Sequence, residues 1–262
     1  MVADPFALAP AKEIADRKKE RVHRYGPGNK IVCVTDSLGE PKNEWLSRSK
    51  VAQELQRASG DTLAEIVVGL GNKIPLWDAD CTLRWRFNDV SMQAFANPGA
   101  AKTAIESMFH EAVGQWGNGC PVQFEKVDER HDFEIVMRSE KRCSPFGCVL
   151  ASAFFPDGGQ HELIVYPSMF EQDRAEQIET LVHEIGHIFG LRHFFALVEE
   201  QDWPAVVVGE HSKYSIMNYG DDSKLMPADI ADLRKLYDNV WARKIVAING
   251  TPIKLMRPFS AS

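Results

Sequence analysis

The sequence has 262 residues, of which 44% are hydrophobic and 26% are charged. This balance is typical of a globular protein that buries a sizeable core. The formal net charge of −7 argues against a nucleic acid partner, because phosphate binding requires a basic surface. No run of about 18 apolar residues occurs, so no insertion into a membrane is predicted. The five cysteines are too sparse for a disulfide scaffold, and Cys143 and Cys148 either form a disulfide or remain thiols.

Residues 1–72 are predicted to form an N-terminal accessory or pro-like segment. Residues 73–262 are predicted to form the main domain. The break is placed at the turn-forming Gly-Leu-Gly-Asn of residues 69–72. Within the first segment, the pattern predicts a strand at residues 31–35 and an amphipathic helix at residues 43–57. The N-terminus lacks a basic region followed by an apolar core, so no signal peptide is predicted. Either the protein stays inside the cell or the sequence begins after processing.

From residue 82 the hydrophobic pattern becomes regular. Leu83, Trp85 and Phe87 alternate with polar residues, as in a half-buried strand. A stripe of apolar residues at helical spacing then predicts a helix over residues 105–116. The next predicted elements are strands at 133–137, 149–155 and 163–166, and a helix at 174–189. This order predicts an α/β (α+β) fold with a mixed sheet.

The chemistry is carried by a motif that reads His-Glu-Ile-Gly-His-Ile-Phe-Gly-Leu-Arg-His. On a helix, His183 and His187 are four residues apart, so both imidazoles leave the same face and can bind one metal ion. Glu184 is displaced from that face but can reach a water on the metal. Gly190 is placed where the helix could end in a left-handed turn, after which His193 could supply a third nitrogen. Three neutral imidazoles with an open fourth position predict one catalytic Zn²⁺.

A second motif, Ser-Ile-Met-Asn-Tyr-Gly at residues 215–220, follows about two dozen residues later. An extended histidine motif with a later methionine turn resembles the metzincin clan. The resemblance implies that Met217 forms an apolar floor beneath the zinc ligands. In astacin-like and serralysin-like members, a tyrosine at the place of Tyr219 lies near the zinc. The resemblance therefore implies that Tyr219 is a catalytic residue that stabilises the oxyanion.

Much of residues 82–240 resembles the matrixin catalytic domain. The segments that follow the matrixin order are 83–87, 104–116, 121–136 and 149–156. The resemblance implies a metzincin-type domain with a twisted mixed sheet, an active-site helix and a mainly helical C-terminal subdomain, in which Asp229 braces the methionine turn. It also implies that an edge strand lines the substrate cleft, with the residues Val149, Leu150, Ala151, Ser152 and Ala153.

The sequence departs from the matrixin pattern at several positions. Ser152 stands where matrixins have a histidine that helps to bind a second, structural zinc, and the later histidine and aspartate of that site are missing around residues 164–168. We therefore expect no structural zinc, and calcium is left open. Tyr219 replaces a matrixin proline. His131 and His161, which remain nearby, are expected to be surface residues.

These observations predict a zinc-dependent endopeptidase that hydrolyses internal peptide bonds of a polypeptide substrate. Zinc would lower the pKa of its water towards about 7, and Glu184 would act as the general base and return the proton to the leaving amine. One alternative is a zinc hydrolase of a non-peptide amide or ester. Another is a non-catalytic binding module with the metzincin fold, against which the intact Glu184 argues. The clan resemblance implies an extracellular location.

Overall fold

The computed structural model describes residues 4–8, 65–68, 73–144, 147–192, 206–209, 215–217, 224–248 and 251–261. The elements predicted at residues 31–35 and 43–57 lie outside the described residues. In chain order, the elements are β1 (Glu65–Val68), β2 (Ile74–Trp77), β3 (Thr82–Phe87), α2 (Asp89–Met92), α3 (Pro98–Trp116), η1 (Gly117–Gly119), β4 (Gln123–Lys126), β5 (Phe133–Met137), β6 (Arg142–Ser144), β7 (Gly147–Val149), β8 (Ala151–Ser152), β9 (His161–Val165), η2 (Pro167–Glu171), α4 (Arg174–Ile188), β10 (Leu191–Arg192), β11 (Val206–Gly209), α6 (Pro227–Trp241), β12 (Ala247–Ile248), β13 (Thr251–Met256) and η3 (Phe259–Ala261).

The centre of the fold is a five-stranded mixed sheet in the order β4-β3-β5-β9-β8. Strands β4, β3, β5 and β9 are parallel, and β8 runs antiparallel to β9 at one edge. Buried and part-exposed residues alternate along β3, as its sequence predicted. The strand predicted at residues 149–155 is instead divided at Leu150, because β7 pairs with β6 whereas β8 pairs with β9.

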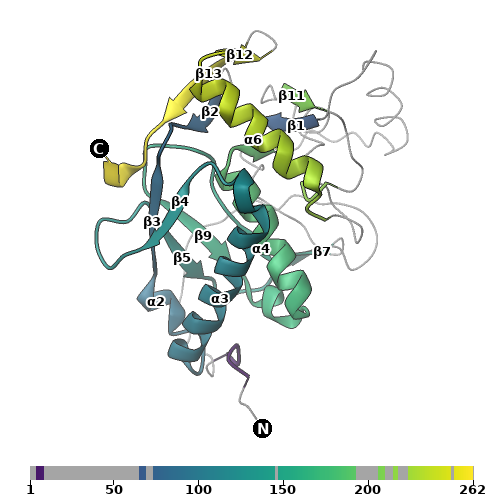
Figure 1. The fold of residues 1–262 in the computed structure, drawn as a ribbon. Coiled ribbons are helices and arrows are strands. Elements are labelled where there is room, and N and C mark those ends of the chain that lie inside the picture. Colours follow the sequence, from purple (N-terminus) through teal and green to yellow (C-terminus); the bar gives the residue numbers. More distant parts are fainter. Residues whose placement is uncertain are drawn as a thin grey trace.

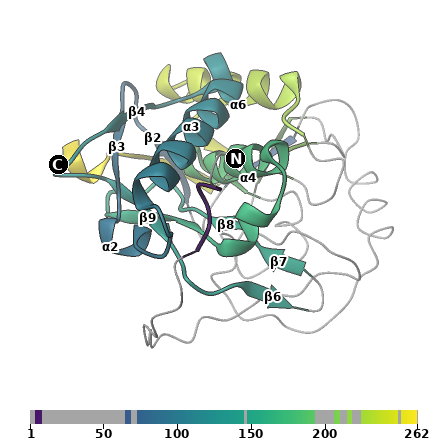
Figure 2. The same ribbon diagram turned by 90° about the horizontal axis from the view of Figure 1, so that it is seen from below.

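Two long helices, α3 and α4, pack side by side next to this sheet (Figures 1 and 2). Helix α3 begins where the Asn97 side chain accepts a hydrogen bond from the backbone of Ala100, with Pro98 at the first helical position. Helix α4, which carries His183 and His187, begins in the same way, because Asp173 accepts from the backbone of Glu176 at 3.0 Å. The helices predicted at residues 105–116 and 174–189 are confirmed, and each starts at a capping side chain.

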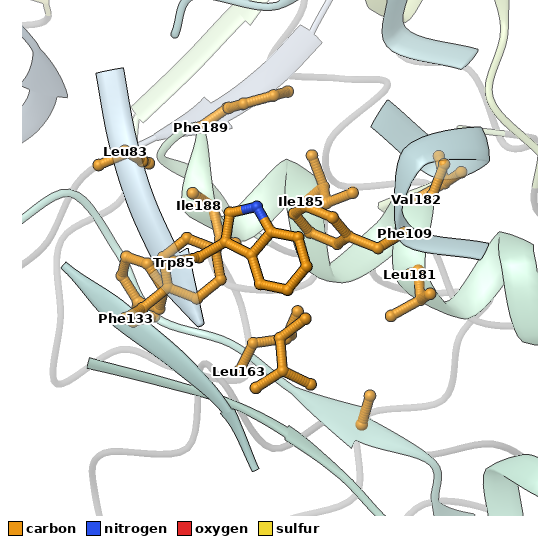
Figure 3. Packing of buried hydrophobic residues seen from close by; sticks show 14 of the residues in the cluster. Leu83, Trp85, Phe109, Phe133, Leu163, Leu181, Val182, Ile185, Ile188 and Phe189 are labelled. Atoms are coloured by element: carbon orange, nitrogen blue, oxygen red, sulfur yellow. The ribbon is translucent and has the colours of Figure 1, made fainter. Parts of the chain in front are cut away.

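The core lies between the sheet and these helices (Figure 3). The Trp85 ring on β3 is fully buried, with its centroid 5.2 Å from that of Phe109 on α3. From α4, Ile185 and Ile188 enter the same cluster and are also fully buried. Removal of so much aromatic and aliphatic surface from water is the main stabilising contribution. Because Ile185 and Ile188 are held in this core, the opposite face of α4 points away from it.

The C-terminal part contains helix α6. It also contains the strand pair β12 and β13, which no sequence pattern predicted. Strand β13 pairs antiparallel with β12 and parallel with β2, with Ile253 opposite Ile74 and Met256 opposite Trp77. The end of the chain then crosses to the main sheet, where the backbone and hydroxyl of Ser260 both donate to the buried carboxylate of Asp132. Strand β13 therefore joins the C-terminal end of the chain to β2, about 180 residues earlier in the sequence.

Two described stretches of the N-terminal 72 residues contact the rest of the chain. The ring of Phe6 stacks on Phe170 with centroids 4.4 Å apart, and Ala7 accepts a hydrogen bond from the backbone of Ala96. Strand β1 pairs with β10 and β11. No helix within the described ranges is long and apolar enough to cross a membrane.

Candidate zinc site

Helix α4 brings the first two motif histidines together on one face. The rings of His183 and His187 have centroids 4.9 Å apart and planes that meet at 85°. This is the arrangement that a spacing of four residues on a helix produces. Glu184 lies beside them on the same helix and is only 2% exposed. A carboxylate is rarely so buried without a specific role.

Backbone carbonyl groups hold both imidazoles in a defined orientation. His183 Nδ1 lies 2.7 Å from the carbonyl oxygen of Ile216, and His187 Nδ1 lies 2.8 Å from that of Leu191. Because a carbonyl oxygen can only accept a hydrogen bond, Nδ1 of each ring carries the proton and donates it. In the neutral form of each ring, the lone pair is then on Nε2. This is the form in which imidazole binds zinc, with Nδ1 held by a second partner.

The methionine turn lies directly against the histidine motif. A Cβ atom at Gly186 would lie 2.5 Å from Sδ of Met217, so the absence of a side chain at position 186 allows this contact. Asp229, on α6, accepts hydrogen bonds from the Ser215 side chain and the Ile216 backbone. Burial raises the pKa of Asp229, and these hydrogen bonds partly offset that effect. Helix α6 is thereby attached to the segment whose carbonyl orients His183.

The end of α4 is a tight turn at Gly190. This residue has φ of +88°, in the left-handed region that favours glycine, and its N–H donates to the carbonyl of His187 at 2.8 Å. A Cβ there would also lie 3.1 Å from both Pro75 O and Leu76 Cδ2. Conformation and space therefore both require glycine. The turn returns Leu191 to the helix, where its carbonyl meets the ring of His187.

The edge strand β8 lies next to the histidine helix. Phe155, three residues after β8, places its ring 5.5 Å from that of His187, nearly perpendicular to it. The residues Val149, Leu150 and Ala151 are each 1% exposed, and Ser152 is 7% exposed. These four residues are therefore buried, whereas Ala153, the last of the predicted cleft residues, is partly exposed.

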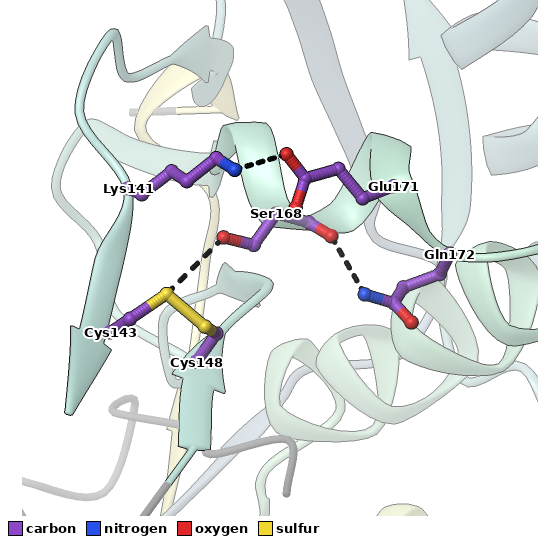
Figure 4. The surroundings of a disulfide bond; sticks show 6 residues. All are labelled: Lys141, Cys143, Cys148, Ser168, Glu171 and Gln172. Atoms are coloured by element: carbon purple, nitrogen blue, oxygen red, sulfur yellow. Dashed lines mark hydrogen bonds and ion pairs between the residues drawn. A yellow bond between two sulfur atoms is a disulfide. The ribbon is translucent and has the colours of Figure 1, made fainter. Parts of the chain in front are cut away.

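A disulfide lies at the start of this edge. Cys143 and Cys148 are bonded and close the β6-β7 hairpin (Figure 4), which settles the alternative that the sequence left open. Cys143 Sγ lies 3.6 Å from the hydroxyl of Ser168, and Lys141 forms an ion pair with Glu171. Both partners are on η2, just before α4, whereas β7 leads into β8. The cross-linked hairpin therefore connects η2, which precedes α4, with the edge strand β8.

His193 and Tyr219 lie outside the described residues, so the third nitrogen and the tyrosine remain predictions. Within the described ranges, no group of three or more His, Cys, Asp or Glu side chains is arranged to hold a metal ion. An open surface hollow lies elsewhere, between η1 and α6, lined in part by Asn118, Ile230 and Arg234. The two carbonyl groups that orient the histidines could not be identified from the sequence, since every residue carries a carbonyl.

The matrixin family matches residues 77–238, the part that contains α4, the methionine turn and α6. The chain belongs to the matrixin family. This membership confirms the matrixin-like metzincin domain that the sequence predicted. The matrixin is similar to Metalloendoproteinase 4-MMP of Arabidopsis thaliana, with 29% identity over 133 residues that cover 45% of this chain and 38% of that relative. It therefore spans less than half the length of this curated relative.

Among solved structures, this matrixin is similar to myroilysin, with a TM-score of 0.39 and 13% identity. The similarity covers 65% of this chain and 98% of the myroilysin chain.

His131 and His161 are partly buried rather than fully exposed. His161 stacks on Phe154 with ring centroids 4.5 Å apart, and its Nε2 is buried with no hydrogen-bond partner within the described part of the chain. The side chain of His131 is 14% exposed, 3.8 Å from Glu134. Burial lowers the pKa of both imidazoles. This burial could not be predicted from the hydrophobic pattern, because it depends on how the loops before β5 and β9 meet.

These two histidines predict a loss of stability below neutral pH. Because their pKa values are lower in the folded than in the unfolded chain, the unfolded chain binds more protons as the pH falls below 6.5, the ordinary value. Full stability is therefore present above pH 6.5 and is lost as the pH falls through the folded pKa values. We expect the urea midpoint to decrease between pH 7.5 and 5.5, and to decrease less in His161→Phe, which keeps the stacked ring. Equal decreases in both proteins would contradict this assignment.

Proposed function

We propose that this matrixin is a zinc-dependent endopeptidase, with His183, His187 and His193 as zinc ligands and Glu184 as general base. The observation that supports this most directly is the pair of hydrogen bonds from the Nδ1 atoms of His183 and His187 to backbone carbonyls. Two imidazoles 4.9 Å apart, each with its Nδ1 held by a backbone carbonyl, fit the chemistry of a catalytic zinc site. The family, which consists of metalloendopeptidases, supports the same reaction.

Zinc, when bound, would supply a Lewis acid that lowers the pKa of a water molecule to about 7. Glu184 would take a proton from that water as the oxygen attacks the peptide carbonyl carbon, and would return it to the amine that leaves. Its 2% exposure would keep competing solvent away from this transfer. We assign Tyr219 to stabilisation of the oxyanion. We assign Met217 to the apolar floor of the site, and its close approach to Gly186 supports this role.

Residues 149–153, which include the edge strand β8, are proposed to bind an extended polypeptide by strand addition. The position of β8 at the sheet edge and the contact of Phe155 with His187 support this role. We also propose that residues 1–72 are an accessory or pro-like segment, and that release of a pro-segment would change access to the cleft. Assay of the chain before and after limited proteolysis separates the two roles. Activity rises on removal of a pro-segment and does not rise on removal of an accessory segment.

Removal of the metal is expected to abolish peptide cleavage. The purified chain should contain one Zn²⁺, and dialysis against 1,10-phenanthroline should reduce cleavage of a mixed-sequence peptide library to background. One equivalent of Zn²⁺ should restore it, whereas Mg²⁺ should not, because Mg²⁺ prefers oxygen ligands to imidazole. Library cleavage that survives complete removal of the metal would contradict the proposal.

The same library separates the alternatives. A chain that holds zinc and hydrolyses small amides or esters, but no library peptide before or after proteolysis, would be a non-peptide hydrolase. A chain that holds zinc and hydrolyses neither would be a binding module with this fold. Cleavage at internal bonds would give the side-chain preferences at the same time.

A further inference from the structure

The last carbonyl groups of α4 accept hydrogen bonds from side chains outside the helix. A helix end leaves its final carbonyls without partners inside the helix. Here the indole Nε1 of Trp77 donates to Ile188 O at 2.7 Å, and the hydroxyl of Tyr237 donates to Phe189 O at 3.0 Å. These two carbonyls lie between His187 and the turn at Gly190. The C-terminal end of the active-site helix is therefore held by two aromatic side chains.

The two aromatic residues are connected to each other. The backbone N–H of Trp77 donates to the Tyr237 hydroxyl at 3.2 Å, and each residue is 1% exposed. Burial raises the pKa of the Tyr237 hydroxyl well above its ordinary value, so the hydroxyl keeps the proton that it donates to Phe189. Trp241 also donates its single indole N–H to Trp77 O at 3.0 Å, and not to a carbonyl of α4. Trp77 and Tyr237 are called the aromatic clamp below.

The clamp depends on parts of the chain beyond the matched family region, which ends at residue 238. Trp77 is the last residue of β2, and β2 is paired along its length with β13, where Met256 lies opposite Trp77. The carbonyl of Met256 accepts from the backbone of Asp78 at 2.9 Å. The C-terminal strand therefore fixes the backbone that presents the Trp77 indole to α4.

We propose that Trp77 and Tyr237 are positioning residues for the zinc site. The proposal rests on the zinc-dependent function proposed above. The path from Ile188 to Leu191 is only four residues long, and the clamp holds its first two carbonyls while the Leu191 carbonyl orients His187. Loss of a clamp hydrogen bond would allow this turn to shift. The ring of His187 and the chain that leads to His193 would shift with it.

The decisive variant is Tyr237→Phe, which removes the hydroxyl and keeps the ring. Trp241→Phe is the matched control, because it removes a hydrogen bond from the same cluster without releasing a carbonyl of α4. The first readout is the rate at which the zinc-loaded full chain transfers Zn²⁺ to an excess of a chromogenic chelator. Urea unfolding of each variant corrects for differences in global stability. Steady-state cleavage of one library peptide then gives kcat and KM.

We expect Tyr237→Phe to release zinc about 10-fold faster than the wild type, the usual scale for loss of a partner behind a ligand. We also expect kcat to fall with little change in KM, whereas Trp241→Phe should stay within about twofold in both measurements. Trp77→Phe should reproduce the faster release and is the deciding variant if Tyr237→Phe does not fold. Equal zinc release from the clamp and control variants at matched stability would overturn the proposal.

Failure of this inference can be distinguished from failure of the proposed function. If the wild type holds zinc but cleaves no peptide, the endopeptidase proposal fails and the zinc-release comparison still decides the role of the clamp. If the wild type holds no zinc, both proposals fail.

Discussion

Replacement of Glu184 by glutamine is expected to lower kcat for peptide cleavage by about 10²–10⁴-fold, the usual contribution of a general base. Glutamine has nearly the same shape as glutamate, but its amide cannot take a proton from water. Glu184 is 2% exposed and follows His183 directly on α4. The substitution should therefore remove the base and leave the zinc content at one ion per chain. Steady-state kinetics on one library peptide, together with metal analysis, measure both quantities.

Glu179→Gln is the matched control, because Glu179 lies on the same helix but is only partly buried. This variant should cleave peptide at a rate within about twofold of the wild type. Zinc retention with unchanged kcat in Glu184→Gln would remove Glu184 from the role of general base. A parallel loss of zinc and activity would instead assign it a role in holding the metal.

Replacement of Gly190 by alanine should produce the largest loss of stability. An alanine at φ of +88° is strained, and its Cβ would lie 3.1 Å from the carbonyl oxygen of Pro75 and from Leu76 Cδ2. Strain and overpacking together should reduce the free energy of unfolding by about 2–4 kcal/mol. The displaced turn should also accelerate zinc release, since it carries the Leu191 carbonyl that orients His187. Urea unfolding and transfer of zinc to a chelator test the two effects.

Gly114→Ala on α3 provides the control for this prediction. A Cβ at Gly114 would meet nothing within 4 Å, and the residue lies inside a regular helix. Alanine should therefore be neutral or should stabilise the protein by up to about 1 kcal/mol, because it restricts the unfolded chain. A similar loss of stability in both glycine variants would show that the tight turn at Gly190 is not the cause.

The local features of the fold could be predicted because they depend on short-range spacing. The alternation along β3 and the apolar stripe of α3 follow the periods of a strand and a helix. The four-residue spacing of His183 and His187 placed them on one face of α4 for the same reason. The left-handed turn at Gly190 was expected from its position after the helix, and its φ agrees.

Features that join distant segments could not be predicted from these patterns. Strand β13 pairs with β2, although about 180 residues separate them, and no local period indicates that partner. The burial of His161 against Phe154 likewise depends on tertiary packing. The disulfide between Cys143 and Cys148, by contrast, joins residues only five positions apart, and the sequence already offered it as an alternative. Sequence patterns identify which residues are apolar, but several alternative pairings can bury the same residues.

The sequence by itself determined which side chains are available for the proposed chemistry: a histidine helix, a glutamate beside it and a methionine turn that follows. The tertiary structure decided how those groups are held. The carbonyls of Ile216 and Leu191 orient the imidazoles, and the aromatic clamp of Trp77 and Tyr237 holds the end of the helix. The physical reason is that ligand type is a property of side chains. Orientation depends instead on backbone groups, which are the same at every position until the fold places them.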